Sequence, residues 1–286
     1  TTFPDQALPA LLALAPQLSR RIEVDTDYGA AAVVAQVDSR IHVQVEPLKE
    51  GLRMRLRTRP LGVDGIYFVP AVGTTEILGL RDGAPVRARR VLADEQRELN
   101  QLLLDAPLLA GGENGDDIDI PAAETALEAL SQLLELGERV LLDWSQHKRW
   151  SLTRRLGVGQ LALKVRAQRD WFHTEGGLKL DDGQVVSLAS LLEALPSSQG
   201  RFVRLADDRI IALSQELARQ LRQVRALADQ RGRLDLAPVA AAILQPLIDA
   251  GADIDLDQAF EEQLRRIARA EEINPEVPAN LEAELR

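Results

Sequence analysis

The 286-residue chain contains no cysteine, which excludes disulfide bonds and thiolate metal sites. Aromatic residues make up only 3% of it, so the core has to be built from Leu, Ala, Val and Ile. No run of about 18 apolar residues is present, as a transmembrane helix would require. The apolar segment 8–18 contains two prolines and follows Asp5, unlike a signal peptide. We therefore expect a cytoplasmic protein with no membrane partner.

Basic residues are outnumbered by acidic ones, and the formal net charge of −10 gives a pI near 5.0. A molecule with this charge repels phosphates as a whole, so any contact with nucleic acid has to be local. The three histidines, His42, His147 and His173, lie far apart and have no zinc-ligand spacing. We expect no metal site and no cofactor in this chain.

Strands dominate the predicted structure of the first hundred residues. The segments 21–27, 41–46 and 52–59 each alternate apolar and polar residues, which places one apolar face on each strand. This pattern is typical of an antiparallel sheet with one face covered by a core. A helix is expected over 94–104, opened by Asp94 as its N-cap. The polar, glycine-rich stretch 110–117 then indicates a boundary or a long surface loop.

Short strands and helices alternate in the second part of the chain. Helical spacing of leucines precedes Gly137, and Ser187 is expected to cap a short helix. The pairs Gly176-Gly177 and Asp182-Gly183 are typical of hairpin turns. Strands are predicted at 140–144, 161–165, 171–174, 178–180, 202–205 and 210–213.

Helical periodicity takes over after residue 214, and the two-proline tail 274–286 indicates an extended connector. The pattern as a whole predicts an α+β fold, with antiparallel sheets and flanking helices followed by a C-terminal helical segment. We expect three parts: a β-rich α+β subdomain at 1–112, a second α+β subdomain with hairpins at 113–213, and helices with a connector at 214–286.

No catalytic motif is present. The glycines of "GVGQLAL" at Gly157 are not followed by the lysine and Ser or Thr of a phosphate-binding loop, so they indicate a turn. Counted from Asp253, the acidic run "GADIDLDQAFEE" has Gln258 at the sixth position and Leu264 at the twelfth, where a calcium loop has glycine and glutamate. We expect Asp255 or Asp257 to cap a helix instead. We therefore expect no catalytic residues and no metal ligands.

An arginine occupies every second position of "GLRMRLRTRP" at 51–60, so Arg53, Arg55, Arg57 and Arg59 share one face of the predicted strand. Such a row could bind an anionic partner or form the solvent-facing side of a sheet. The equally regular acidic row of Glu23, Asp25 and Asp27 favours the structural interpretation. Cross-strand pairs of opposite charge stabilise a sheet by about 0.2–1 kcal/mol each.

The stretch 145–169 contains several basic residues and no acidic one, with tryptophans at 144, 150 and 171 in or beside it. Basic charge with interleaved aromatic residues is compatible with phosphate contact, although tryptophans at this spacing also serve as core anchors. The candidate residues for binding nucleic acid are Lys148, Arg149, Arg154, Arg155 and Arg166.

Three segments resemble the region ahead of the ATPase core in bacterial Swi/Snf-type helicase-like proteins: "ETALEALSQLLELGERVLLDW" at 124–144, the run "DWFHTEGGLKLDDGQVVSLASLLEAL…GRFVRLADDRIIAL" at 170–213, and "NPEVPANLEAELR" at the end. In that family the final Leu-Arg commonly precedes Pro-Tyr-Gln, where the ATPase begins. The resemblance covers 124–286 well and the first 110 residues loosely. The chain, which begins with Thr1, looks like a piece of a longer protein.

This resemblance implies an accessory region of an ATP-dependent DNA translocase. ATP and Mg would belong to a downstream ATPase core, whose Walker and arginine-finger motifs are absent here. The expected function is therefore non-catalytic regulation or scaffolding, with the ATPase core as a partner in cis and duplex DNA as a further partner. The alternative is a nucleic-acid-binding module that uses the basic stretch. An independent hydrolase is disfavoured because no nucleophile, metal cluster or phosphate loop is visible.

Overall fold

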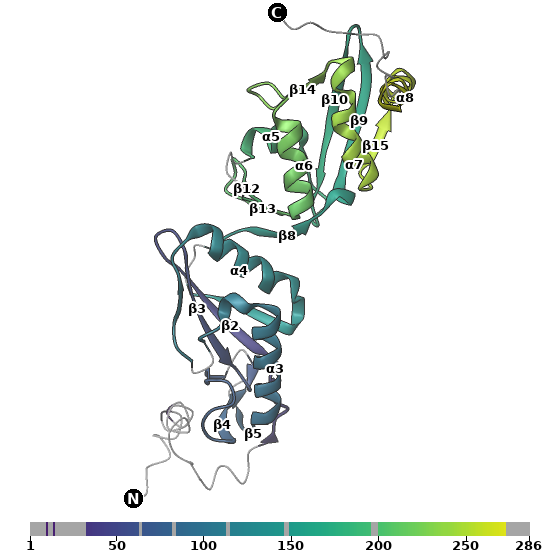
Figure 1. Ribbon diagram of the computed structural model, residues 1–286. Helices are drawn as coiled ribbons and strands as arrows, with labels where there is room; N and C mark the ends of the chain where they lie inside the picture. Colours follow the sequence, from purple (N-terminus) through teal and green to yellow (C-terminus); the bar gives the residue numbers. More distant parts are fainter. Residues whose placement is uncertain are drawn as a thin grey trace, which may run out of the picture. The chain divides into compact units, whose positions relative to one another are not determined.

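The computed structural model describes residues 33–62, 65–81, 84–112, 115–145, 149–195 and 200–272, together with positions 10 and 14. The chain forms two compact units, Thr1–Trp150 and Ser151–Arg286, called the N-terminal and C-terminal units below (Figure 1). Both units combine helices with mostly antiparallel sheets, which confirms the predicted α+β class.

The N-terminal unit is built on a four-stranded sheet in the order β6-β3-β2-β7. The antiparallel pair at its centre is β2 (Ile41–Pro47) and β3 (Leu52–Thr58). At its edges lie β6 (Ile118–Ile120), antiparallel to β3, and β7 (Val140–Trp144), parallel to β2. Residues beyond 112 therefore complete the first sheet, and the boundary expected at 112/113 does not separate two units.

Two helices accompany this sheet: α3 (Leu92–Asp105), which packs against β2, and α4 (Ala123–Glu135), which packs against β6 (Figure 1). Helix α3 starts earlier than predicted, with Val91 at the N-cap and no side-chain cap, so Asp94 lies in its first turn. A second sheet has the order β1-β5-β4, from β1 (Val33–Val34), β4 (Glu76–Arg81) and β5 (Ala84–Arg89). The short 3-10 helices are Pro107–Leu109 and Gly137–Arg139.

The C-terminal unit contains a sheet in the order β11-β10-β9-β15, with β14 also paired to β10. A separate three-stranded sheet has the order β12-β13-β8. The strands are β8 (Leu152–Leu156), β9 (Leu161–Gln168), β10 (Trp171–Lys179), β11 (Val185–Ser187), β12 (Phe202–Arg204), β13 (Ile210–Leu213), β14 (Leu234–Leu236) and β15 (Asp253–Leu256).

The helices of this unit are α5 (Leu188–Ala194), α6 (Gln215–Arg225), α7 (Gln245–Asp249) and α8 (Gln258–Glu272), with 3-10 segments at Val158–Gln160 and Pro238–Leu244. Because β14 and β15 join the sheet of β9 and β10, the segment after 214 is part of the same unit and not a separate helical part. The expected cap of α5 is confirmed, since Ser187 Oγ accepts a hydrogen bond from the Ser190 N–H at 3.1 Å.

One turn prediction is wrong. Gly176 and Gly177 lie inside β10, which runs unbroken from Trp171 to Lys179, whereas the turn at Asp182-Gly183 does connect β10 to β11. Glycine is required at 176 because its φ is +134° and a Cβ would lie 2.2 Å from the Ala162 carbonyl oxygen. The glycine pair therefore allows close strand pairing instead of chain reversal.

The core of the C-terminal unit lies on one face of the main sheet, where Leu161, Leu163 and Val165 of β9 are buried. Helix α8 contributes Phe260, which meets Phe172 edge-to-face with ring centroids 4.9 Å apart. Each such buried side chain contributes about 1.5–3 kcal/mol. The opposite face of the sheet carries charged side chains and the small residues Ala162 and Gly177, over which lies a shallow hollow of about 490 Å³.

Candidate functional site

Strand β3 has the two faces that its alternation predicts. Leu52, Met54 and Leu56 are completely buried on one side. The side chains of Arg53 and Arg55 lie on the other side and retain about a third of their exposure, 32% and 30%. The arginine row is therefore half-covered, and its role depends on what lies across from it.

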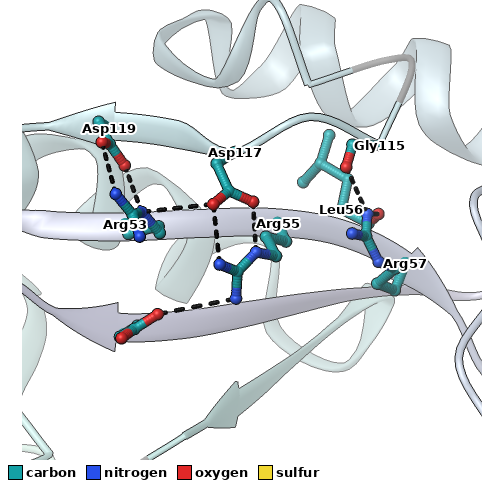
Figure 2. A network of polar contacts seen from close by, with 8 residues as sticks. Arg53, Arg55, Leu56, Arg57, Gly115, Asp117 and Asp119 are labelled. Carbon is teal, nitrogen blue, oxygen red and sulfur yellow. Dashed lines mark hydrogen bonds and ion pairs between the residues drawn. The ribbon is translucent and has the colours of Figure 1, made fainter.

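Acidic side chains of the neighbouring strand region meet the first two arginines (Figure 2). Arg53 donates from Nε and Nη2 to the two carboxylate oxygens of Asp119, at 2.6 and 2.8 Å. Arg55 makes the same two-pronged contact with Asp117, with Nη2 at 2.8 Å from Oδ2, and lies 3.7 Å from Glu46 of β2. Paired planar contacts of this kind are the strongest ion-pair geometry available to arginine.

These partners differ from the predicted ones. The acidic row of Glu23, Asp25 and Asp27 lies outside the described residues. The bidentate carboxylates are those of Asp117 and Asp119, which lie more than sixty residues after the arginines in the sequence. Asp119 belongs to β6 and Asp117 directly precedes it. The structural interpretation of the row is thus supported with a different acidic partner, one that local alternation alone could not identify.

The remaining arginines of the row bind backbone carbonyls. Arg57 donates to the carbonyl oxygens of Leu56 and Gly115, at 2.8 and 3.0 Å (Figure 2). Arg59 donates to the Gly65 carbonyl at 2.8 Å and stacks over Tyr67 at 4.8 Å from the ring centroid. Every arginine of the row therefore has a partner within the N-terminal unit.

Protonation equilibria respond to this pairing. The hydrogen bond to Arg55 lowers the pKa of Asp117, and the hydrogen bond to Arg53 lowers the pKa of Asp119. The same contacts raise the pKa of Arg53 and Arg55, which stay charged at any accessible pH. At neutral pH the two arginines and the two aspartates are therefore all charged and paired with one another.

A second network in this unit is fully buried. The side chains of Arg90 and Glu95 are 0% and 1% exposed, and Arg90 Nη2 lies 2.6 Å from Glu95 Oε2. The guanidinium also donates to the carbonyls of Val69, Val72 and Thr74 and stacks over the Phe68 ring. Glu95 in turn accepts the N–H of Ala71, whose φ is +58°. The pair fixes the loop 69–74, and no sequence motif announces it.

A third group joins three distant segments. His42 Nδ1 lies 2.6 Å from Asp143 Oδ2, and the Tyr67 hydroxyl donates to the same oxygen at 2.8 Å. Burial, and then the hydrogen bond to Asp143, raises the pKa of Tyr67. His42 Nε2 is buried without a hydrogen-bond partner among the described residues. Because this atom has no access to solvent, the group resembles an internal link between β2, β7 and the segment around Tyr67 more than an open catalytic site.

Of the predicted nucleic-acid residues, the described ones lie in different segments of the chain. Lys148 lies outside the described residues, and exposed Arg149 belongs to the N-terminal unit. Arg154 and Arg155 are exposed on β8, the edge strand of the order β12-β13-β8. Arg166 lies on β9 in the other sheet of the C-terminal unit.

The part of the basic stretch on β9 is neutralised by residues from far along the chain. Arg166 binds Asp255 of β15, and that hydrogen bond raises the pKa of Arg166. Lys164 stands between Glu175 and Asp255 in the strand register. The stretch 145–169 has no acidic residue of its own, but strand pairing places acidic residues beside Lys164 and Arg166 in the folded unit.

The structure also bears on the predicted roles of the tryptophans and of the acidic run 251–262. Trp171 is 54% exposed, so it is not a core anchor, whereas Trp144 and Trp150 are partly buried. Asp257 accepts the N–H of Ala259 at 2.7 Å in the first turn of α8, as expected for a helix cap. Asp255 is occupied by Arg166.

In the described part of the chain, no three His, Asp or Glu side chains gather as metal ligands. None of the helices placed there combines the length and the apolar character needed to cross a membrane. No protein-family model matches the sequence, and no curated protein is similar enough to count as a relative.

Proposed function

We propose that the chain is a non-catalytic regulatory or scaffolding region of a cytoplasmic Swi/Snf-type ATP-dependent DNA translocase, which positions the ATPase lobes or the DNA. The observation that supports the scaffolding part is the arginine network, whose Arg53 and Arg55 pair with carboxylates of the same unit. Arg53 and Arg55, part of a row that could have bound an anionic partner, are paired with Asp119 and Asp117. The link to a translocase comes from the sequence resemblance.

In this proposal the chain holds no cofactor, while ATP and Mg are bound by an ATPase core supplied in cis. The isolated chain should then give no ATP turnover above a no-enzyme blank, because it lacks a lysine loop to neutralise the phosphates. Turnover that disappears when a residue within 1–286 is mutated would overturn the proposal.

The reading frame beyond codon 286 tests the translocase link separately. Continuation into Pro-Tyr-Gln and a glycine-lysine phosphate loop is the expected result, and a stop codon there would rule the link out. If the frame continues, DNA-stimulated ATP hydrolysis by the longer product should change in rate when residues 1–286 are removed.

A second candidate function, weak binding of nucleic acid, is favoured by the exposure of Arg154 and Arg155 on an edge strand and of Trp171 on the neighbouring sheet. Phosphate contacts by two arginines would give weak, sequence-independent and salt-sensitive binding. Fluorescence anisotropy with a labelled duplex tests this function without any ATPase core.

A further inference from the structure

The outer edge of β11 has no strand paired to it in the described part of the chain. This strand is the terminal member of the order β11-β10-β9-β15, and among the described strands it pairs with β10 alone. An edge strand presents alternate N–H and C=O groups to whatever lies beside it. Which residue presents them here follows from the register.

The hairpin hydrogen bonds identify that residue as Val185. The Leu180 N–H donates to the Gln184 carbonyl at 2.8 Å, which makes Leu180 and Gln184 a hydrogen-bonded pair. The next pair in the register is Lys179 with Val185. Hydrogen-bonded and non-hydrogen-bonded pairs alternate in an antiparallel ladder, so the N–H and C=O of Val185 point away from β10.

A groove of about 620 Å³ runs along this edge. It lies between β11, α5 and the turn 205–209, and its volume is within the range of about 300–1,000 Å³ that is usual for ligand-binding clefts. Val185 at its rim is 64% exposed, one of the more exposed large apolar side chains in the described residues. Backbone groups and an apolar side chain thus face the same open groove.

The lining of the groove indicates which side chains it would accept. Leu205 and Ala194 supply apolar surface and Glu193 supplies a carboxylate, while the Asp207 carboxylate is paired with Arg209. The one guanidinium, Arg209, is already held at 2.7 Å by Asp207 and at 2.7 Å by the Gln184 side chain. The groove therefore favours apolar side chains alternating with basic ones.

From these features we propose that the β11 edge is a docking site for an extended segment of a partner polypeptide. The segment adds as a strand beside Val185, with main-chain hydrogen bonds to its N–H and C=O and with apolar and basic side chains in the groove. This site does not depend on the proposed link to a translocase, so it can succeed or fail independently of it.

The test uses synthetic peptides and the ¹⁵N-labelled 286-residue chain. An acetylated, amidated Lys-Val-Lys-Val-Lys-Val peptide should shift the amide resonances of Val185, Ser187 and the turn 205–209. The same peptide methylated at every main-chain nitrogen has no N–H group on either edge, so it cannot form the ladder and should bind about tenfold more weakly. A Glu-Val-Glu-Val-Glu-Val peptide should also bind more weakly, because its carboxylates meet that of Glu193.

Two variants separate the backbone from the side chain. Val185→Pro removes the outward N–H and leaves the β10 ladder intact, and should weaken peptide binding about tenfold. Val185→Thr keeps the N–H and should weaken it about threefold or less. If Val185→Pro does not fold, binding of the N-methylated peptide to the parent chain still tests whether main-chain hydrogen bonds hold the segment.

Three outcomes would overturn the proposal. These are unshifted Val185 and Ser187 amides with every peptide at millimolar concentration, equal affinity for the N-methylated peptide, and equal losses for the proline and threonine variants. The last outcome would indicate a simple apolar contact.

Discussion

In the N-terminal unit, Arg53 and Arg55 meet Asp119 and Asp117 across the sheet, whereas in the C-terminal unit Arg154 lies exposed on an edge strand. The difference comes from the neighbouring strand: the region of β6 offers carboxylates to β3, while β13 offers only apolar residues to β8. The availability of an arginine for a partner thus depends on the strand paired beside it and not on the density of basic residues.

The N-terminal unit also contains ion pairs of very different burial. The Arg90–Glu95 pair is almost completely buried, while the arginine row keeps about a third of its exposure. Removing one partner of a buried pair leaves an uncompensated charge in the interior. At the surface, water and salt compensate for most of the loss.

The largest effect is therefore expected for Glu95→Ala, which leaves the Arg90 guanidinium buried without its carboxylate. We expect a loss of about 3–5 kcal/mol in the stability of the N-terminal unit. Hydrogen exchange should accelerate in β3 and remain unchanged in β9. The control Arg90→Met with Glu95→Leu should recover much of the loss, and a single variant as stable as the parent would contradict the network's role.

The C-terminal unit should be most sensitive at Gly176. Gly176→Val places a Cβ 2.2 Å from the Ala162 carbonyl oxygen at a φ of +134°, so we expect a loss of about 2–4 kcal/mol. Amide hydrogen exchange measures this effect and should become faster in β9 and β10 alone. Gly159→Ala, where a Cβ would meet nothing within 4 Å, is the matched control and should melt like the parent. Equal melting of the two variants would refute the close pairing.

A smaller effect is expected from acid. The pKa values of Asp117 and Asp119 lie below the ordinary value of 3.8, so their stabilising effect is complete above that value. It is lost as the pH falls from there through the lowered pKa values, because the unfolded chain takes up protons more readily than the folded one. Melting temperatures measured from about pH 6 to about pH 2.5 should fall less steeply for Asp117→Asn with Asp119→Asn than for the parent. Parallel curves would show that the pairing does not stabilise the fold.

The weakest effect concerns DNA. Arg154→Ala with Arg155→Ala should reduce the salt dependence of duplex binding by about 0.9 for each phosphate contact that is lost. Anisotropy at low ionic strength measures it, with exposed Arg204→Ala as the control. The same affinity and slope for the variant and the parent would remove the nucleic-acid function from this edge.

Local alternation was sufficient to predict β2, β3 and the buried face of Leu52, Met54 and Leu56. It could not predict that Asp117 and Asp119 lie beside Arg55 and Arg53, since a strand's own pattern carries no information about its neighbour. The same limit explains Arg166, whose partner Asp255 lies 89 residues away.

Other features of the structure were not predicted from the sequence, for different reasons. Gly176-Gly177 has the composition of a turn, but the strand continues through it because the backbones need close approach. Arg90 and Glu95 are ordinary surface residues in composition, and only the tertiary fold buries them. The unit boundary near 150 has no glycine-rich marker, while the glycine-rich stretch at 110–117 lies within the first unit.

The most direct test of the account is a charge exchange in the arginine network, measured by thermal melting and duplex binding on the same samples. Arg53→Glu with Arg55→Glu should lower the melting temperature by about 3–6 °C, because the two new carboxylates then face those of Asp117, Asp119 and Glu46. Adding Asp117→Arg and Asp119→Arg should restore most of it, with DNA affinity unchanged throughout. If the double variant melts like the parent and loses DNA affinity, the row is a binding face and the account is wrong.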